Sequence, residues 1–229
     1  AEILWFSTKK IVSQGSYLKD GKLFFQFRNK PVEFASMDDI NIPGEHNISN
    51  ALAAANVSYI MNLSLDKINE GIQTFTGLPD RLEKIRTLNN IHYYNDTCAT
   101  PPEATIAAIQ SFPGKPVILI LGGKDKKLKY SHLCQTIKNS DNISYLVILK
   151  HPRYDASEMI LKDLLELGLA NKIGTCNSLS DAVRIAYQKA VPGTNILLSP
   201  SATSFGMFQN EFDRGNLFRQ AVKELPDII

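Results

Sequence analysis

Three segments of this 229-residue chain place glycine, hydroxyl and charged residues directly after short apolar runs. They are 95–103 (NDTCATPPE), 122–127 (GGKDKK) and 199–206 (SPSATSFG). Paired glycines let a backbone turn tightly and approach a ligand, lysines attract anions, and hydroxyls donate hydrogen bonds. If the apolar runs are strands of one sheet, the three segments predict a pocket for a small dicarboxylate or an amino acid.

The first of these segments also predicts the start of a helix. Thr100, Pro101 and Glu103 match the N-cap, N1 and N3 positions of a capping box with proline in the first turn. Free N–H groups at such a helix start suit a carboxylate or a phosphate. Capping explains Thr100 and Glu103, but it gives no role to Asn95 or Asp96.

The elements that position these segments follow from an alternation of strands and helices after residue 90. Apolar runs predict strands at 91–95, 117–121, 144–150, 172–176 and 195–199. Helical patterns are expected at 101–111, 130–139, 156–169, 178–190 and about 210–224. This order is typical of βαβ units in an α/β fold with a mainly parallel sheet, which binds ligands beyond the carboxyl ends of its strands.

The first eighty residues follow a different pattern, with strand-like alternation in 3–7, 22–27 and 31–36. Asp20-Gly21 between apolar residues predicts a hairpin. Gly21-Lys22 is not read as a nucleotide phosphate loop, because Leu23 stands where serine or threonine is required. Helices are predicted within the alanine-rich stretch after Gly44 and at 64–75.

His46, Asn47 and Asn50 gather at the start of the first of these helices. Asn47 and Asn50 are one turn apart and share a face. Two interpretations remain open: an N-cap with a satisfied histidine, or the edge of a ligand site made of side-chain amides.

Composition limits the partners. The net charge of +2 is too balanced to predict a nucleic acid or an anionic membrane as partner, and no apolar run reaches membrane-spanning length. The cysteines, Cys98, Cys134 and Cys176, lack metal-ligand spacing and fit a reducing cytoplasm. We expect Cys98 to be a buried residue rather than a nucleophile, because the sequence shows no partner histidine for it.

Five ordered motifs resemble those of Mur-type amide ligases. GEHNISNALAA (44–54) resembles the adenine-side helix of the family, and LPDRLE (78–83) resembles its hinge. NDTCATPPEAT (95–105), LILGGKDK (119–126) and LSPSATSFGMF (198–208, followed by Arg214-Gly215) resemble signatures of the branch that adds D-glutamate. The resemblance runs from about residue 42 to the C-terminus.

The resemblance implies a UDP-substrate domain, a central ATPase domain and a C-terminal Rossmann-like domain in the whole enzyme. Residues 1–81 are expected to be the C-terminal part of the central domain, and residues 82–229 the C-terminal domain. ATP would phosphorylate the carboxylate of UDP-N-acetylmuramoyl-L-alanine, and D-glutamate would then attack the acyl phosphate. The implied cofactors are ATP and Mg²⁺, and the implied enzyme is a cytoplasmic monomer. The P-loop and the metal ligands would precede Ala1, so we expect the chain alone to be inactive.

The resemblance also implies roles for seven residues. The positions that match ATP contacts are Asn50, Arg81 and Asp96, the last at the ribose. The positions that match D-glutamate contacts are Thr100, Lys126, Ser204 and Phe205. In this reading Lys126 pairs with one substrate carboxylate, while Ser204 and the backbone of Phe205 hydrogen-bond another.

The chain departs from the family pattern at three places. Cys98 stands where the family often has lysine, Asp80 replaces the usual hinge histidine, and Glu211-Phe212 reverses a common order. Three alternatives therefore stay open: a related ligase that adds another amino acid or extends folate with glutamate, a non-catalytic amino-acid-binding module, and a nicotinamide-dependent dehydrogenase. The dehydrogenase shares only the fold, which does not fix function.

Overall fold

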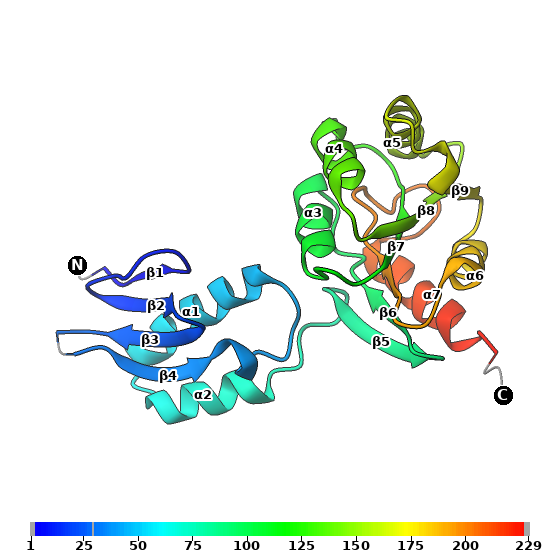
Figure 1. The fold of residues 1–229 in the computed structure, drawn as a ribbon. Helices are drawn as coiled ribbons and strands as arrows, with labels where there is room; N and C mark the ends of the chain where they lie inside the picture. Colours follow the sequence, from blue (N-terminus) through cyan, green and yellow to red (C-terminus); the bar gives the residue numbers. More distant parts are fainter. Residues whose placement is uncertain (1–2, 29, 227–229) are drawn as a thin grey trace. The chain divides into compact units, whose positions relative to one another are not determined.

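The computed structural model describes residues 3–28 and 30–226. The chain divides into two compact units, Ala1–Gly77 and Leu78–Ile229, whose helices and strands are labelled in Figure 1. Residues 78–81, which the sequence analysis placed in the first domain, belong to the second unit.

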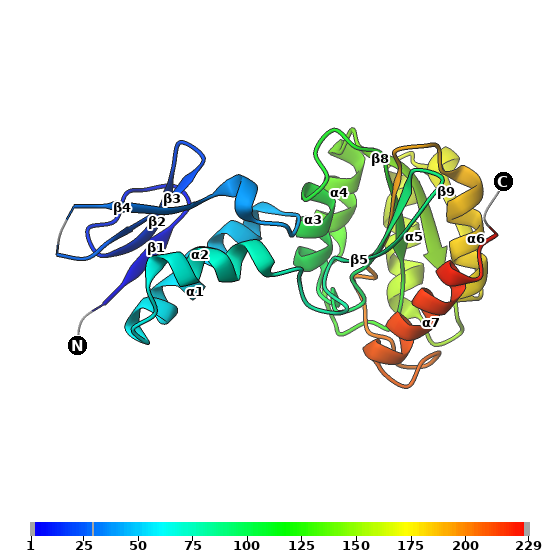
Figure 2. The ribbon, with the colours of Figure 1, turned by 90° about the horizontal axis from the view of Figure 1, so that it is seen from below.

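The first unit is a four-stranded sheet with two helices. Its strands lie in the order β1-β2-β3-β4, with β1 and β2 parallel and the other pairs antiparallel. They span Trp5–Ser7, Gly15–Lys19, Lys22–Gln26 and Val32–Ser36. A 3₁₀ turn (η1, Met37–Asp39) leads to α1 (Glu45–Ile60) and α2 (Leu65–Thr74), and Figure 2 shows both helices along one side of the sheet. The core between these layers is formed by Leu23, Phe25, Phe34, Leu52 and Ile68.

The hairpin predicted at Asp20-Gly21 is confirmed. It joins β2 to β3, and both turn residues have positive φ, 51° and 76°, as a two-residue hairpin turn of this kind requires. The strand β2 was not predicted, because it begins with glycine and serine. Gly15 has a φ of 116°, and a side chain there would collide with the Trp5 backbone of the neighbouring strand.

The second unit is a six-stranded sheet with the order β5-β6-β10-β7-β8-β9. The strands β6 to β10 are parallel to their neighbours, and β5 is antiparallel to β6. In chain order the strands span Glu83–Leu88, Ile91–Asn95, Val117–Leu121, Ile143–Leu149, Ile173–Cys176 and Asn195–Leu198. This arrangement confirms the predicted α/β fold with a mainly parallel sheet.

Helices cover both faces of this sheet. They are α3 (Pro102–Gln110), α4 (Ser131–Asn139), α5 (Asp155–Glu166), α6 (Leu179–Lys189) and α7 (Glu211–Lys223), with a 3₁₀ turn, η2, at Ala170–Lys172. Leu119 and Leu121 of β7 pack in the cluster formed with α3, α4 and α5, whereas Ile118 and Ile120 pack in the cluster formed with α6 and α7. Figure 2 shows α6 and α7 on the opposite side of the sheet from α3 and α4.

The predicted elements of this unit agree with the structure to within three residues at every end. The strand β5 was not predicted, because charged residues interrupt its apolar ones (EKIRTL). The helix α5 ends at Glu166 rather than near 169, since Gly168 adopts a φ of 78° and closes the helix.

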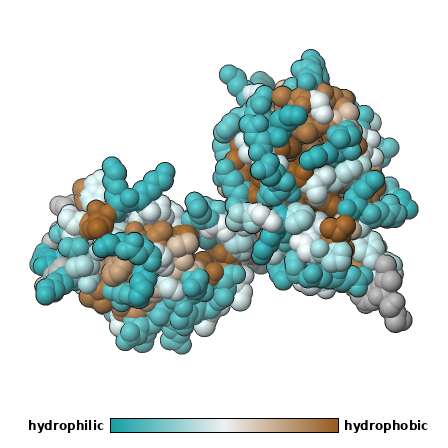
Figure 3. Space-filling model, in the orientation of Figure 1, coloured by the Kyte–Doolittle hydropathy of each residue, from teal (hydrophilic) through white to brown (hydrophobic). Residues whose placement is uncertain are grey.

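Exposed hydrophobic side chains lie on β1 and on the C-terminal half of α1, two elements in contact with each other. Trp5 is 60% exposed and Met61 is 71% exposed, and Phe6, Val57 and Ile60 are also exposed. Figure 3 shows hydrophobic side chains among hydrophilic ones on the surface of this unit.

Candidate functional site

The order β6-β10-β7 brings the three segments singled out in the sequence to one edge of the sheet. The Asp96 amide donates to the Leu198 carbonyl at 2.9 Å, which joins the segment after β6 to the end of β10. The Gly122 amide donates to the Pro200 carbonyl at 3.0 Å, which joins the segment after β7 to the same loop. The assumption that the three segments share one sheet edge is thereby confirmed.

The loop after β10 is bonded on both sides. The Ser201 amide donates to the Ala99 carbonyl at 2.9 Å on one side. On the other side Lys124 and Thr203 exchange backbone hydrogen bonds of 3.0 and 3.1 Å, and the Thr203 hydroxyl also donates to the Lys124 carbonyl. A side chain at Gly123 would collide with the Thr203 carbonyl, so the second glycine of the GGK motif permits this close approach.

Asp96 lies buried at the end of β6 with both carboxylate oxygens in hydrogen bonds. Its Oδ1 accepts from the Leu82 amide at 3.2 Å, and its Oδ2 accepts from the Ser199 hydroxyl at 2.8 Å. Burial raises the pKa of Asp96 to about 6, although both hydrogen bonds and the charge of Arg81 act in the opposite direction. Asp96 is therefore a desolvated acceptor that titrates near neutral pH.

The predicted capping box at Thr100 is wrong. The helix α3 begins one residue later, at Pro102, and Pro101 is its N-cap without a side-chain hydrogen bond. The cause is the Pro-Pro pair, because a residue before proline avoids the helical region, and Pro101 has a ψ of 152°. Proline also lacks an N–H group, so this helix start offers fewer donors to an anion than the sequence analysis assumed. Thr100 is left as a half-buried residue between Ala99 and the helix.

Ser204 and Phe205 end the loop after β10. Ser204 is only 1% exposed, and its carbonyl accepts from the Tyr154 hydroxyl at 3.0 Å, which attaches the loop to the start of α5. The side chain of Phe205 is 55% exposed. Ser201, in the same loop, has a φ of 56° and a buried hydroxyl without a hydrogen-bond partner among the described residues. An unpaired buried hydroxyl in a strained loop marks a place where a ligand group can supply the missing hydrogen bond.

Lys126 is exposed, and its ammonium forms no hydrogen bond or ion pair with any of the residues that the structure describes. The neighbouring Asp125 fixes the loop, since its Oδ1 accepts from the Leu128 amide at 3.0 Å and from the Tyr130 hydroxyl at 2.8 Å. Burial acts to raise the pKa of Asp125, but these hydrogen bonds outweigh it and the pKa is lowered. The hydrogen bonds of Asp125 thus fix a loop that carries Lys126, whose ammonium has no partner among the described residues.

Arg214 of α7 is fully buried and was given no role by the sequence analysis. Its Nε donates to the Thr97 hydroxyl at 2.9 Å, and its two terminal nitrogens donate to the carbonyls of Ala202 (3.2 Å) and Thr97 (2.8 Å). Burial lowers the pKa of Arg214 to about 10. Arg214 therefore joins the loop after β6 to the loop after β10 from beneath, and its only sequence signal is the Arg-Gly pair after the last motif.

The residues predicted to contact ATP lie in both units. In α1 the Asn50 side chain donates to Asn47 Oδ1 at 3.1 Å, which confirms their shared face. The N-cap of α1 is Gly44 and no side chain caps it, so the capping interpretation of this trio is wrong. Arg81 is exposed and belongs to the second unit, as does Asp96.

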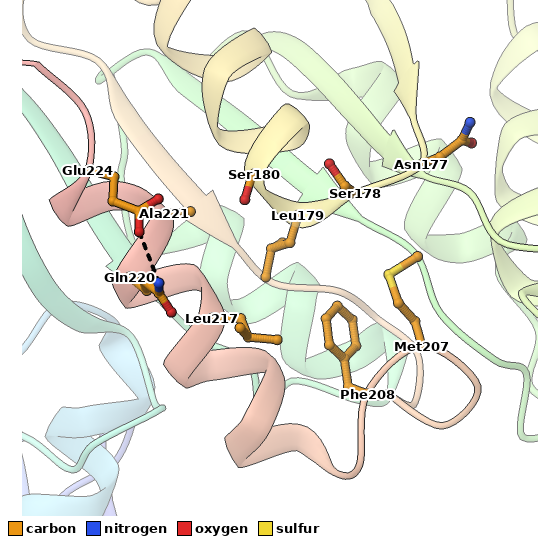
Figure 4. A pocket seen from close by; sticks show the side chains of 10 residues that line it. All are labelled: Asn177, Ser178, Leu179, Ser180, Met207, Phe208, Leu217, Gln220, Ala221 and Glu224. Carbon is orange, nitrogen blue, oxygen red and sulfur yellow. Dashed lines mark hydrogen bonds between the residues drawn. The ribbon is translucent and has the colours of Figure 1, made fainter.

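A separate open pocket lies between α6, α7 and the loop after β10, shown in Figure 4. Met207, Phe208, Leu179 and Leu217 form its apolar part, and the Gln220 side chain donates to Glu224 at 2.9 Å on its polar side. None of the residues predicted to hold D-glutamate lines this pocket.

Comparison with known proteins assigns the family. The family model for the glutamate ligase domain of Mur ligases matches residues 80–202, which is more than half of the chain. This chain belongs to the Mur ligase family. Its β6-β10-β7 edge therefore belongs to a Mur ligase domain.

Curated relatives share one name. The UDP-N-acetylmuramoylalanine--D-glutamate ligases of Caldanaerobacter subterraneus subsp. tengcongensis and Acetivibrio thermocellus are 37% and 38% identical to this chain over 226 and 227 residues. Each match covers 98% of this chain but 48% of the relative. The chain thus spans about half the length of the curated relatives it matches.

Solved structures support the Mur ligase fold. The UDP-N-acetylmuramate-alanine ligase MurC of Thermotoga maritima superposes with a TM-score of 0.65 at 16% identity, over 95% of this chain and 47% of that one. A folylpolyglutamate synthase of Mycobacterium tuberculosis, solved with ADP, gives 0.63 at 20% identity, over 89% and 46%. At these identities the likeness concerns the fold alone.

Neither a metal centre nor a membrane span is found in this Mur ligase chain over residues 3–28 and 30–226. No three His, Cys, Asp or Glu side chains in that range lie together as a metal site. No helix in the same range is long and apolar enough to cross a membrane.

Proposed function

We propose that this chain supplies the D-glutamate pocket and part of the ATP site of an ATP-dependent ligase that joins D-glutamate to UDP-N-acetylmuramoyl-L-alanine. The observation that carries the proposal is the sheet edge where Lys124 pairs with Thr203 of the loop that holds Ser204. Two residues further on, Lys126 is exposed and its ammonium has no partner among the described residues. The names of the relatives support the choice of D-glutamate as substrate.

The pocket would act by holding the two ends of an amino acid. The Lys126 ammonium pairs with one carboxylate of D-glutamate, and the Thr100 and Ser204 hydroxyls, with the backbone at Phe205, bind the other. The amine of D-glutamate is then free to attack the acyl phosphate. The new C–N bond forms, the C–O bond to phosphate breaks, and the amine loses a proton to its surroundings. In such a step the rate enhancement comes from holding the amine and the acyl phosphate in the geometry of the reaction.

A covalent intermediate on Cys98 is not part of this proposal. Burial raises the pKa of the Cys98 thiol, and the nearby carboxylates raise it further against the opposing charge of Arg81. A thiol with a raised pKa is a poor nucleophile at neutral pH.

The two units receive different assignments in this proposal. The unit Ala1–Gly77 forms the C-terminal part of a central ATP-binding domain, and the unit Leu78–Ile229 forms the C-terminal domain. The exposed hydrophobic side chains on β1 and α1, Trp5 and Met61 among them, support a first unit that is completed by further protein. ATP contacts come from Asn50, Arg81 and Asp96, and the Mg²⁺ that accompanies ATP would be held outside the described residues. We further propose a cytoplasmic monomer, which agrees with three free cysteines.

The test is a titration of the isotope-labelled chain with D-glutamate, L-glutamate and ADP, followed by NMR. We expect saturable shifts for D-glutamate at the amides of Thr100, Lys126 and Ser204. Lys126→Ala should weaken D-glutamate binding by roughly tenfold to a hundredfold, the cost of a charge-assisted hydrogen bond. Lys129→Ala is the matched control, because Lys129 is also exposed and lies three residues from Lys126 in the connection between β7 and α4.

Other outcomes separate the alternatives. Equal or stronger shifts with L-glutamate or another amino acid would replace the proposal with a related ligase of the family. D-Glutamate binding without any ADP response in the completed, full-length protein would favour an amino-acid-binding module.

A further inference from the structure

The segment that carries Arg81 is held in an unusual backbone conformation. Asp80 and Leu82, on either side of Arg81, have φ values of 65° and 45°. Aspartate adopts such values more readily than most residues, but leucine does so only where surrounding contacts impose them. The Arg81 side chain itself is exposed.

Asp80 is the centre of these contacts. Its side chain is 7% exposed, and its Oδ1 accepts from Arg219 of α7 and from the Asn95 amide group, both at 2.8 Å. Its carbonyl accepts from the Cys98 amide at 3.2 Å, and its own amide donates to Glu83 at 2.9 Å. Arg219 also pairs with Glu83 at 2.7 Å, so one guanidinium holds both carboxylates.

The helix α7 is shaped to receive this carboxylate. A side chain at Gly215 would collide with Asp80 Oδ1 and crowd Asn95 and Thr97. The absence of a side chain at Gly215 therefore lets Asp80 lie against the helix, one turn before Arg219. Leu82 completes the arrangement, since its amide donates to Asp96 Oδ1 at 3.2 Å.

We propose that the Asp80–Arg219 ion pair is a positioning device that fixes the backbone of Arg81 and Leu82, and through them Asp96, for nucleotide binding. This role of the ion pair rests on the proposed function, in which Arg81 and Asp96 contact ATP. All of these contacts of Asp80 lie within the second unit. Asp80 thus holds this segment through its ion pair with Arg219 and not through a contact with the ligand.

The first measurement is amide hydrogen exchange by NMR on this chain, without ligand. Asp80→Asn and Arg219→Met should each speed exchange at the Leu82 and Cys98 amides by about tenfold or more, because the free energy of local opening falls. Core amides of β7 should not change. Arg219→Lys, which keeps a charge, should restore part of the protection. Glu166→Gln is the matched control, because it removes the exposed Lys162–Glu166 pair of the same unit.

The second measurement compares affinities for ADP and for D-glutamate in the full-length protein. The Asp80 and Arg219 variants should bind ADP about fivefold to tenfold more weakly, while D-glutamate affinity stays within about twofold, which a general loss of folding would not produce. Unchanged exchange, or faster exchange with unchanged ADP affinity, would overturn the proposal. If the unmodified protein fails to bind ADP, the proposed nucleotide contact is wrong. The exchange result alone then decides whether the Asp80–Arg219 ion pair fixes the backbone of Arg81 and Leu82.

Discussion

The two sides of the candidate site use charge in opposite ways. Beside β6, Asp80, Asp96 and Arg214 are buried and bonded to their neighbours. Beside β7, Lys124 and Lys126 are exposed, and the Lys126 ammonium has no partner within residues 3–28 and 30–226. Burying a charge costs free energy unless the charge is fully hydrogen-bonded, so the buried charges here are tied to the loops around them. An exposed lysine stays hydrated and pays this desolvation cost only when a ligand binds. The comparison separates charges that hold loops together from charges that remain in solvent.

Truncation of Arg214 should give the largest effect on stability. Arg214→Ala leaves the Thr97 and Ala202 carbonyls without donors and opens a cavity, and we expect a loss of about 3–5 kcal/mol in the free energy of unfolding. Urea denaturation measures this loss. Arg184→Ala, which removes an exposed arginine paired with Asp181, should cost less than about 1 kcal/mol. Equal costs for the two variants would show that the buried contacts of Arg214 add nothing to stability.

Neutralising Asp96 should stabilise the fold above its pKa. The pKa is raised from 3.8 to about 6 in the folded protein, so the folded state binds the proton more tightly than the unfolded state. Stability conferred by that proton is present below about pH 4 and is lost as the pH rises to about 6. Asp96→Asn should therefore be more stable than the unmodified chain at pH 7.5, by at most about 3 kcal/mol, with the difference vanishing near pH 4. Thermal unfolding across this pH range tests the sign, and a destabilised Asp96→Asn at pH 7.5 would contradict it.

Labelling of Cys98 should give the smallest effect. Its raised pKa predicts that iodoacetamide modifies the folded chain at pH 7.5 more slowly than it modifies a free cysteine, by about threefold or more. Mass spectrometry of the peptide containing Cys98, with the urea-unfolded chain as control, measures the rate. Faster labelling than in the unfolded chain would instead place a reactive thiol on the buried side of the site.

The sequence alone determined the elements of the second unit other than β5 and η2, to within three residues at each end. Apolar runs such as 117–121 are short, rich in β-branched residues and flanked by proline or glycine, which favours buried strands over helices. The Asp20-Gly21 turn was equally readable, because few residue pairs tolerate two positive φ values. Local chemistry also misled, since the proline after Pro101 moved the helix start away from Thr100.

Only the tertiary structure decided which loops meet and what holds them. Strand order follows from packing over long sequence separations, so the place of β10 between β6 and β7 could not be read from local patterns. For the same reason Arg214, more than one hundred residues from Thr97, showed no sign of its contacts in the sequence. Asp80 and Arg219 are separated even further, and their ion pair exists because α7 returns to the first strands of the sheet. A charged residue reveals its type in the sequence, but its burial and its partners depend on the fold.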